Sequence, residues 1–225
     1  VLFRSIAQVS AQAGYHVLLA DVSRERADAG KAGIAAQLAR AVSKEKITAE
    51  VADQTLARIE TTEGPSAMGK CGLIIEAATE REEIKRAIFA EVGKVLGTTA
   101  VLASNTSSIP ITRLAQATPD PKRFIGVHFF NPVPVMGLIE IIRGLATSDE
   151  TVTLIETYAA ALGKQVVRAN DAPGFIVNRI LMPMLNEACF ALGEGVATIR
   201  DIDLACQDRK STRLNSSHTD ISRMP

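Results

Sequence analysis

One histidine and one glutamate stand close together in the sequence, in two neighbouring apolar runs. His128 closes the run at residues 124–127, which Asn131 ends, and Glu140 interrupts the run at residues 137–142. A buried carboxylate is costly unless it is paired, and strands close in sequence usually lie together, so we expect His128 and Glu140 to pair. The second ring nitrogen is then a general base near neutral pH. The alternative is a hydrogen-bonded core histidine.

Five small polar residues at 104–108 follow a short apolar run at residues 100–103. Such residues cap helices, and residues 111–117 with Pro110 near their start predict a helix. A cap does not need all five side chains. Because ligands bind at the carboxyl ends of strands in open α/β sheets, we expect a hydroxyl of this run and His128 to converge on one substrate oxygen.

An acidic residue ends a predicted strand near the start of the chain, where Asp21 follows the apolar run at residues 15–20. In a dinucleotide-binding unit such an acid holds the ribose hydroxyls, whereas the alternative is the N-cap of the helix that begins near Ser23. The fingerprint GxGxxG does not precede Ile6. We expect that the sequence given lacks the first strand and the phosphate loop of such a unit.

Four further positions could contact a dinucleotide or a substrate. Ala77 and Glu80 follow the apolar run at residues 71–77 and would border the nicotinamide ribose, with Lys85 one turn into the next helix. Lys44 lies at the turn of a predicted helical hairpin, where it could meet a phosphate group. The alternative for both lysines is an ordinary solvated surface lysine.

The stretch at residues 175–192 is apolar almost all round a helix, as in a helix buried in a dimer or a second domain. Asn178 lies in its first turns, and Pro183 is expected to distort the backbone beside it. Asn178 is either a satisfied core amide or a hydrogen-bonding partner of the substrate, and we favour the second.

Apolar strand-like runs alternate with helical patterns, which predicts an α/β fold with a doubly wound sheet. The predicted strands are residues 15–20, 71–77, 100–103, 124–128, 137–142 and 165–169. The predicted helices are residues 6–13, 23–42, 47–59, 81–96, 111–117, 149–162, 175–192 and 198–205.

The composition argues against several kinds of function. The 225 residues include 25 basic and 25 acidic side chains, which gives no signature of binding to nucleic acid or to an anionic membrane. There is no membrane-spanning apolar run and no signal peptide. Cys71, Cys189 and Cys206 form no CxxC pair, so we expect neither disulfides nor a metal site, and a reducing cytoplasm fits.

Three motifs together resemble the short-chain 3-hydroxyacyl-CoA dehydrogenases, and the bacterial 3-hydroxybutyryl-CoA dehydrogenases in particular. They are SNTSS at residues 104–108, GVHFFNPVPVMGLIEII at 126–142 and DAPGFIVNRILMPMLNEA at 171–188. The resemblance extends from about Ile6 to Cys206. It implies a Rossmann NAD-binding domain and a helical domain that dimerises. It also implies oxidation of L-3-hydroxyacyl-CoA to 3-ketoacyl-CoA with NAD, or the reverse with NADH or NADPH.

The resemblance implies a role for each matched residue. His128 is the general base, Glu140 orients it, and Ser107 hydrogen-bonds the substrate oxygen. The other matched positions are Asn178 at the catalytic site, Asp21, Glu80, Lys85 and Asn131 around the cofactor, and Lys44 at the coenzyme A phosphate. The charge of Asp21 favours NAD over NADP because it would repel a 2′-phosphate, although Arg24 nearby weakens that argument.

The resemblance also suggests a domain division. We expect an NAD-binding Rossmann domain at residues 1–170, the start of a helical dimerisation and substrate domain at 171–208, and a disordered tail, foreign in composition, at 209–225. The full-length protein would be a homodimer acting on an acyl-CoA. The phosphate loop has no counterpart here, so we expect this polypeptide to bind NAD poorly.

Three alternatives remain open. The first is a catalytically incompetent fragment or binding protein that keeps the fold. The second is a dehydrogenase of small 3-hydroxy acids that uses a lysine base, against which the histidine–glutamate pair argues. The third is the dehydrogenase segment of a multifunctional fatty-acid oxidation protein.

Overall fold

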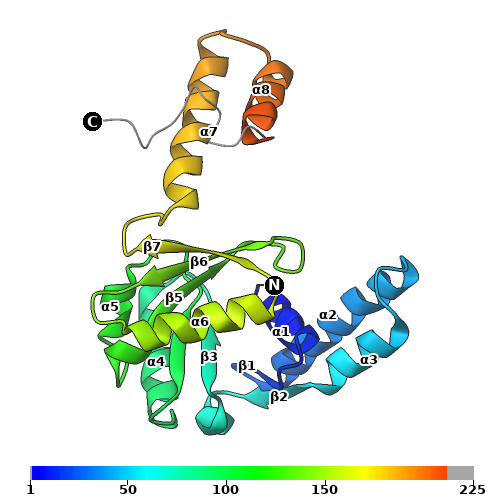
Figure 1. Ribbon diagram of the computed structural model, residues 1–225, viewed down its shortest axis with the longest axis vertical. Coiled ribbons are helices and arrows are strands. Elements are labelled where there is room, and N and C mark those ends of the chain that lie inside the picture. The colour runs from blue at the N-terminus through cyan, green and yellow to red at the C-terminus, as the bar shows by residue number, and fades with distance from the viewer. Residues whose placement is uncertain (1, 212–225) are drawn as a thin grey trace. The chain divides into compact units, whose positions relative to one another are not determined.

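The computed structural model describes residues 2–211 (Figure 1). By its internal contacts the chain divides into two compact units, Val1–Ile176 and Val177–Pro225. The first unit holds all the strands of the described chain. The second holds two helices, α7 (Val177–Gly193) and α8 (Ile199–Ser211).

The strands of the first unit form two sheets. The smaller sheet pairs β1 (Val17–Asp21) with β2 (Ile59–Glu63) in parallel. The larger sheet contains, in spatial order, β3 (Leu73–Glu76), β4 (Val101–Ser104), β5 (Phe124–Phe129), β6 (Leu138–Arg143) and β7 (Gln165–Asn170). Within it only β5 and β6 are antiparallel, and the other neighbours are parallel.

Helices connect these strands and cover the sheets. They are α1 (Leu2–Gln12), α2 (Arg24–Ser43), α3 (Ala49–Ala57), α4 (Glu82–Gly93), α5 (Ile111–Ala115) and α6 (Asp149–Ala161), with short 3-10 helices η1 (Ser66–Lys70) and η2 (Pro121–Arg123). Ser23, Thr48 and Ser148 cap the N-termini of α2, α3 and α6 by accepting a backbone N–H with their side-chain oxygens.

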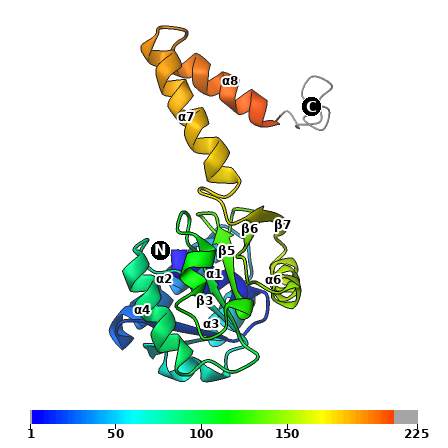
Figure 2. The ribbon, with the colours of Figure 1, turned by 90° about the vertical axis from the view of Figure 1, so that its left-hand side faces the viewer.

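The larger sheet lies between two layers of helices. Apolar side chains of α1 and α6 pack on one face of β4, β5 and β6. Those of α4 and α5 pack on the other face, where the rings of Phe89 and Phe124 meet edge to face. Figure 2 shows α4 and α6 on opposite sides of β3 and β5. A third cluster joins β1 and β2 to α1, α2 and α3.

The predicted α/β class is confirmed, but one strand was missed. We expected a helix through residues 47–59, whereas α3 ends at Ala57 and Ile59 begins β2. Only Ile59 of this strand is buried, and its other residues are polar. A strand that buries one side chain has no alternating apolar signal, so its pairing with β1 comes from tertiary structure.

The end of α8 corrects a second prediction. We expected disorder from residue 209, whereas α8 continues through Ser211. Thr198 Oγ1 accepts the N–H of Asp201 and caps this helix, and no glycine or proline stops it between residues 199 and 211. The rest of the predicted tail, residues 212–225, lies outside the described residues.

Candidate active site

His128 and Glu140 are placed opposite each other by the pairing of two strands. The antiparallel register of β5 and β6 puts the two residues directly across from one another. Nδ1 of His128 lies 2.7 Å from Oε2 of Glu140. His128 is only 5% exposed and Glu140 is fully buried, so this hydrogen bond is shielded from solvent. The contact is the one that the two neighbouring apolar runs predicted.

The second oxygen of Glu140 also has a partner. Oε1 accepts the backbone N–H of Ile176 at 2.9 Å. An ionised carboxylate only accepts hydrogen bonds, so Nδ1 of His128 is the donor in the pair. Nε2 of the neutral imidazole is then an acceptor, and the carboxylate fixes this tautomer.

Nε2 of His128 lies 3.1 Å from Oγ of Ser107. Ser107 is in the loop after β4, which pairs in parallel with β5, so both residues lie at the carboxyl ends of adjacent strands. The rings of Phe130 and Phe175 pack beside the imidazole, with centroids at 4.7 and 5.7 Å. A base nitrogen and a hydroxyl this close can both reach one oxygen atom of a ligand.

The five polar side chains at 104–108 have separate functions. Ser104 Oγ donates to Glu76 at 2.7 Å, and Asn105 Oδ1 accepts the N–H of Phe129 at 2.8 Å. The hydroxyls of Thr106 and Ser108 both donate to Glu80 Oε1. Thr106 Oγ1 also accepts the N–H of Ile109 at 3.0 Å, within the loop. None of the five caps α5, whose N-cap is Pro110, so the capping alternative is wrong for this run. The loop is therefore fixed on both sides of Ser107.

A residue far along the chain caps α5. Asp171 accepts the N–H of Ile111 at 2.8 Å and that of Thr112 at 2.7 Å. The residues just after Asp171 reach His128 through the ring of Phe175 and Glu140 through the N–H of Ile176. The DAPGF motif thus joins α5 to the histidine–glutamate pair.

A buried ion pair lies beside this loop. Lys85 is fully buried, and its Nζ lies 2.9 and 3.0 Å from the two carboxylate oxygens of Glu76. The solvated-surface alternative for Lys85 is therefore wrong. Glu76 was not predicted as a site residue, although it is a lone carboxylate in an apolar strand, the same signal that identified Glu140.

Glu80 links the ion pair to the polar loop. Its Oε2 lies 3.5 Å from Lys85 Nζ, and its Oε1 accepts the N–H groups of Ser107 and Ser108. Partial burial would raise the pKa of the Glu80 carboxyl, but hydrogen bonds from Thr106, Ser107 and Ser108, with the charge of Lys85, lower the pKa below its ordinary value. Glu80 therefore remains a carboxylate over the neutral range.

The residues predicted to surround the cofactor lie at strand ends. Asp21 is the last residue of β1, and its Oδ1 accepts the N–H of Val22 at 2.7 Å. The N-cap alternative for Asp21 is wrong, because Ser23 caps α2. Ala77 follows β3, and exposed Asn131 follows β5. Among the described residues Asp21 Oδ2 has no hydrogen-bond donor, so it fits a ligand that presents a ribose hydroxyl.

Two predicted site residues lie on other elements of the chain. Lys44 is the exposed C-cap of α2, in the turn of the helical hairpin formed with α3. Asn178 lies in the first turn of α7, in the second unit. Pro183 is accommodated inside α7, which runs through it as one helix.

Residues 2–211 contain no group of three or more His, Cys, Asp or Glu side chains that could hold a metal ion. None of the described helices is long and apolar enough to cross a membrane.

The sheet is mostly parallel and lies between two layers of helices, and a histidine–glutamate pair and a serine lie at its strand ends. These features define an α/β dehydrogenase of the NAD-binding class. Comparison with known proteins gives the family. Residues 1–172 match the profile described as 3-hydroxyacyl-CoA dehydrogenase, NAD binding domain, and residues 174–214 match that of the C-terminal domain. The chain belongs to the 3-hydroxyacyl-CoA dehydrogenase family, whose members use NAD(H).

Individual relatives agree with this assignment. A 3-hydroxybutyryl-CoA dehydrogenase of Bradyrhizobium diazoefficiens is 52% identical over 200 residues, which are 89% of this chain and 68% of that relative. The human mitochondrial hydroxyacyl-coenzyme A dehydrogenase is 41% identical, over 89% of this chain and 66% of that relative. The crystal structure of (S)-3-hydroxybutyryl-CoA dehydrogenase from Ralstonia eutropha matches with a TM-score of 0.87 at 43% identity, over 91% of this chain and 74% of that chain.

Proposed function

We propose that the protein interconverts an L-3-hydroxyacyl-CoA and the corresponding 3-ketoacyl-CoA, with His128 as the general base in oxidation and the general acid in reduction. One observation carries the proposal. Nδ1 of His128 is held by buried Glu140, and Nε2 faces Ser107 Oγ at 3.1 Å. An alcohol oxidation needs a base and a hydrogen-bond donor at one oxygen, and this arrangement supplies both.

The proton transfer follows from the tautomer. In oxidation, Nε2 of His128 accepts the proton of the substrate hydroxyl, and the imidazolium that forms is stabilised by the negative charge of Glu140. The hydroxyl of Ser107 donates to the same substrate oxygen and holds it in place. Phe130 and Phe175 shield the imidazole from water, which strengthens its interaction with Glu140. In reduction the proton moves back from Nε2.

NAD, when bound, accepts the hydride from the carbon that carries the hydroxyl. We assign Asp21 to the adenosine ribose, and Ala77, Glu80, Lys85, Ser107 and Asn131 to the nicotinamide half. Arg24 is bound to Asp28 at 3.3 Å, whereas Arg26 Nε lies 3.8 Å from Asp21. The carboxylate of Asp21 favours NAD over NADP because its charge would repel a 2′-phosphate, and the nearby Arg26 weakens that preference.

The substrate assignment rests on the relatives. Those named as 3-hydroxybutyryl-CoA dehydrogenases are 43 to 52% identical, so we propose a short 3-hydroxyacyl chain. We assign Lys44 to a phosphate of coenzyme A and Asn178 to the acyl end of the site. Lys44 is suited to this role because its ammonium is exposed at the tip of the helical hairpin.

The second unit supports a dimer. Apolar side chains of α7 are exposed, namely Ile180, Met182, Leu185, Phe190 and Leu192. A helix that is apolar nearly all round is typical of one buried in an interface or a second domain, so we propose that the helical part from about residue 171 forms a homodimer. Size measurement by light scattering on Leu185→Glu/Phe190→Glu should give a monomer where the parent protein is a dimer, and a monomeric parent would contradict the assignment.

The test of the catalytic assignment is reduction of acetoacetyl-CoA with NADH. His128→Gln should lower kcat by roughly a hundredfold or more, because the base is lost while the shape is kept. His16→Gln is the matched control, since His16 is an exposed histidine outside the site. The assay uses a chain that also carries the phosphate loop, because NAD binding depends on it. Activity of that chain that is insensitive to His128→Gln would overturn the mechanism, and no activity in it would overturn the function.

A further inference from the structure

The side-chain amide of Asn105 uses only one of its two polar groups. Asn105 follows β4 and is 4% exposed. Its backbone N–H donates to Glu76 O on the β3 side at 2.8 Å, and its Oδ1 accepts the N–H of Phe129 on the β5 side at 2.8 Å. Nδ2 donates to no acceptor among residues 2–211. Buried polar groups normally have partners, so this half-used amide points to a ligand.

The orientation of the amide is fixed by its neighbour. The N–H of Phe129 needs an acceptor, so Oδ1 rather than Nδ2 faces β5. Among the described residues, Oε1 of Gln8 is the one fully buried side-chain polar atom that has no hydrogen-bond partner. Nδ2 of Asn105 has no partner either, so it is not fully buried and reaches the surface of the protein. Asn105 therefore offers a directed hydrogen-bond donor to a ligand.

The strand register shows why Asn105 lies at an opening. β4 pairs with β5 only as far as Ser104 and Gly126, whereas β5 continues to Phe129. Beyond Gly126 the side chain of Asn105 takes the place of a neighbouring strand, because it accepts the N–H of Phe129. β4 thus ends before β5 at the carboxyl edge of the sheet, which is where ligands bind in doubly wound folds.

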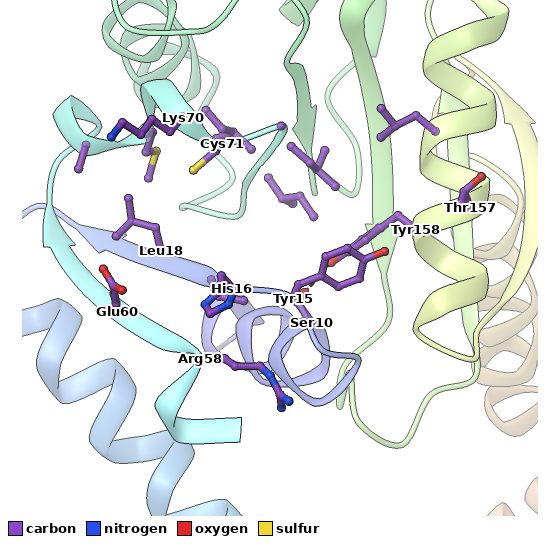
Figure 3. A pocket seen from close by; sticks show the side chains of 18 residues that line it. Ser10, Tyr15, His16, Leu18, Arg58, Glu60, Lys70, Cys71, Thr157 and Tyr158 are labelled. Carbon is purple, nitrogen blue, oxygen red and sulfur yellow. Dashed lines mark hydrogen bonds between the residues drawn. The ribbon is translucent and has the colours of Figure 1, made fainter. Parts of the chain in front are cut away.

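The cavity drawn in Figure 3 lies elsewhere. It has a volume of about 740 Å³, and it is lined by Val17 and Leu18 at the start of β1 and by Gly72 and Leu73 at the start of β3. Asn105 is not among its lining residues. The free amide group therefore belongs to the opposite, carboxyl edge of the strands.

The order of the strands identifies the part of the ligand that Asn105 can reach. The proposed contacts of NAD run along the carboxyl edge, from Asp21 after β1 for the adenosine ribose to Ala77 after β3 for the nicotinamide ribose. The proposed substrate oxygen lies between Ser107 and His128. Asn105 follows β4, which lies between β3 and β5. The nicotinamide ring has to occupy this intermediate position, because hydride transfer requires close contact between the ring and the substrate carbon.

We propose that Asn105 is a cofactor-binding residue, whose Nδ2 donates a hydrogen bond to the carboxamide oxygen of the nicotinamide ring. The inference rests on the proposed function. The carboxamide oxygen is a hydrogen-bond acceptor, and a donor held by the sheet fixes how the ring is turned about its bond to the ribose. Asn105 thereby presents one face of the ring to the substrate held by Ser107 and His128.

Asn105→Asp separates this role from a structural one. A structural role needs only the side-chain oxygen that pairs with Phe129, and a carboxylate keeps that oxygen but cannot donate to a ligand. Asn170→Asp is the matched control, because Asn170 is exposed at the end of β7. β7 is parallel to β6 and β6 is antiparallel to β5, so β7 ends at the opposite edge of the sheet from His128.

The measurement compares NADH with ADP-ribose, which is the same molecule without the nicotinamide ring. Dissociation constants are measured by calorimetry on the chain that also carries the phosphate loop, at about pH 8, where a carboxyl group is ionised. Asn105→Asp should weaken NADH binding about tenfold, because it removes a hydrogen bond and sets a carboxylate against the carboxamide oxygen. It should weaken ADP-ribose binding less than about twofold, and Asn170→Asp should change neither constant by more than that.

Two results would overturn the inference alone. Equal NADH binding by the parent protein and Asn105→Asp would leave Asn105 with only its structural role. Equal weakening of NADH and ADP-ribose would show that the donor does not contact the nicotinamide ring. A parent protein that does not bind NADH would instead overturn the proposed function, and the inference with it.

Nuclear magnetic resonance gives a second measurement, which does not depend on Asn105→Asp folding. In the parent protein with isotope-labelled asparagine, one Nδ2 proton of Asn105 should move downfield when NADH binds, because a hydrogen bond forms. Its exchange with solvent should also slow, and ADP-ribose should cause neither change. An Nδ2 group that responds equally to both ligands, or to neither, would contradict the assignment of Asn105 to the nicotinamide ring.

Discussion

The backbone N–H of Ile176 donates a 2.9 Å hydrogen bond to Oε1 of Glu140. Oε2 of the same carboxylate accepts from His128 Nδ1. The loop that ends the first unit therefore fixes the carboxylate that fixes the imidazole. A side chain held by both oxygens cannot rotate without losing a hydrogen bond, so the orientation of His128 depends on this loop as well as on the β5–β6 register.

Glu140→Gln should separate the charge of this carboxylate from its shape. The amide oxygen can still accept one hydrogen bond, but the negative charge is lost, and an amide N–H facing Nδ1 would favour the wrong tautomer. We expect kcat for acetoacetyl-CoA reduction to fall about 100-fold or more, as when a histidine loses its orienting carboxylate in other enzymes. KM and the dissociation constant of NADH should change less than about threefold.

Glu140→Asp is the matched variant, because it keeps the charge but shortens the side chain. Its kcat should lie between those of the parent protein and Glu140→Gln. Equal activity of Glu140→Gln and the parent protein would show that the pair has only a structural role.

The buried pair of Lys85 and Glu76 leads to a stability prediction. Lys85→Met leaves the buried Glu76 carboxylate without its cation, although Ser104 Oγ and the N–H of Ala78 still donate to it. Because breaking a buried pair costs about 3–5 kcal/mol and two hydrogen bonds remain, we expect a loss of about 3 kcal/mol in the free energy of unfolding. Urea denaturation measures it.

An exposed pair close to the same helix gives the control. Lys94 lies 2.6 Å from Glu91, but their side chains are 66% and 56% exposed. Lys94→Met should change stability by less than about 0.5 kcal/mol. Glu76→Gln combined with Lys85→Met should recover part of the loss, since no buried charge is then unpaired. If Lys85→Met lowered the free energy of unfolding no more than Lys94→Met, the prediction that the buried pair stabilises the fold would be contradicted.

Glu80 should contribute to the acid sensitivity of the fold. The pKa of its carboxyl is lower in the folded state than its ordinary value of 4.5, through the balance of burial against hydrogen bonds described above. A depressed folded pKa gives stability that is present above the unfolded pKa and is lost as pH falls through the folded pKa. The Tm of Glu80→Gln should therefore decrease less than that of the parent protein when the pH falls from about 6 to about 3, a range that brackets the ordinary carboxyl pKa.

Exposed Glu83, on the first turn of α4, is a suitable comparison for this measurement. Glu83→Gln should keep the pH dependence of the parent protein, because the Glu83 side chain is exposed on the first turn of α4. If the Tm of Glu80→Gln and that of the parent protein decreased equally on acidification, the hydrogen bonds of Glu80 would not stabilise its charged form.

Local sequence patterns predicted the strands and helices that bury apolar runs, and they predicted the pair of His128 and Glu140. His128 and Glu140 could be paired from the sequence because two apolar runs close in sequence lie together as β5 and β6. The same reasoning, applied to the apolar run that ends in Glu76, would have found its partner Lys85 nine residues later. Lysines are solvated on most helix surfaces, so the sequence alone favours exposure for Lys85.

Contacts between distant segments could not be predicted in this way. Asp171 caps α5 from sixty residues away, and the N–H of Ile176 reaches Glu140 from thirty-six residues away. Neither leaves a periodic pattern, because one involves a helix N-terminus without a local cap and the other a backbone group. β2 was missed for a related reason, since its pairing with β1 does not depend on an apolar face.

The close approach of β5 to its neighbours predicts that Gly126 cannot be replaced. A Cβ at this position would lie 2.7 Å from Cδ1 of Ile111 in α5 and 2.9 Å from Cβ of Ile142 in β6. Both neighbours are buried in the same cluster, so neither has room to move. Gly126→Ala should therefore lower the free energy of unfolding by about 1–3 kcal/mol, the usual cost of overpacking a core.

Gly137 provides the comparison, because a Cβ there meets no atom within 4 Å. Gly137→Ala should leave the free energy of unfolding unchanged or raise it by up to about 1 kcal/mol, since alanine restricts the unfolded chain. Gly126→Ala should also lower kcat in the folded fraction, because Gly126 precedes His128 by two residues on β5 and a displaced strand moves the imidazole away from Ser107. Equal stability and kcat in the two variants would show that α5 moves to make room for the added Cβ, and that the position of His128 does not depend on this contact.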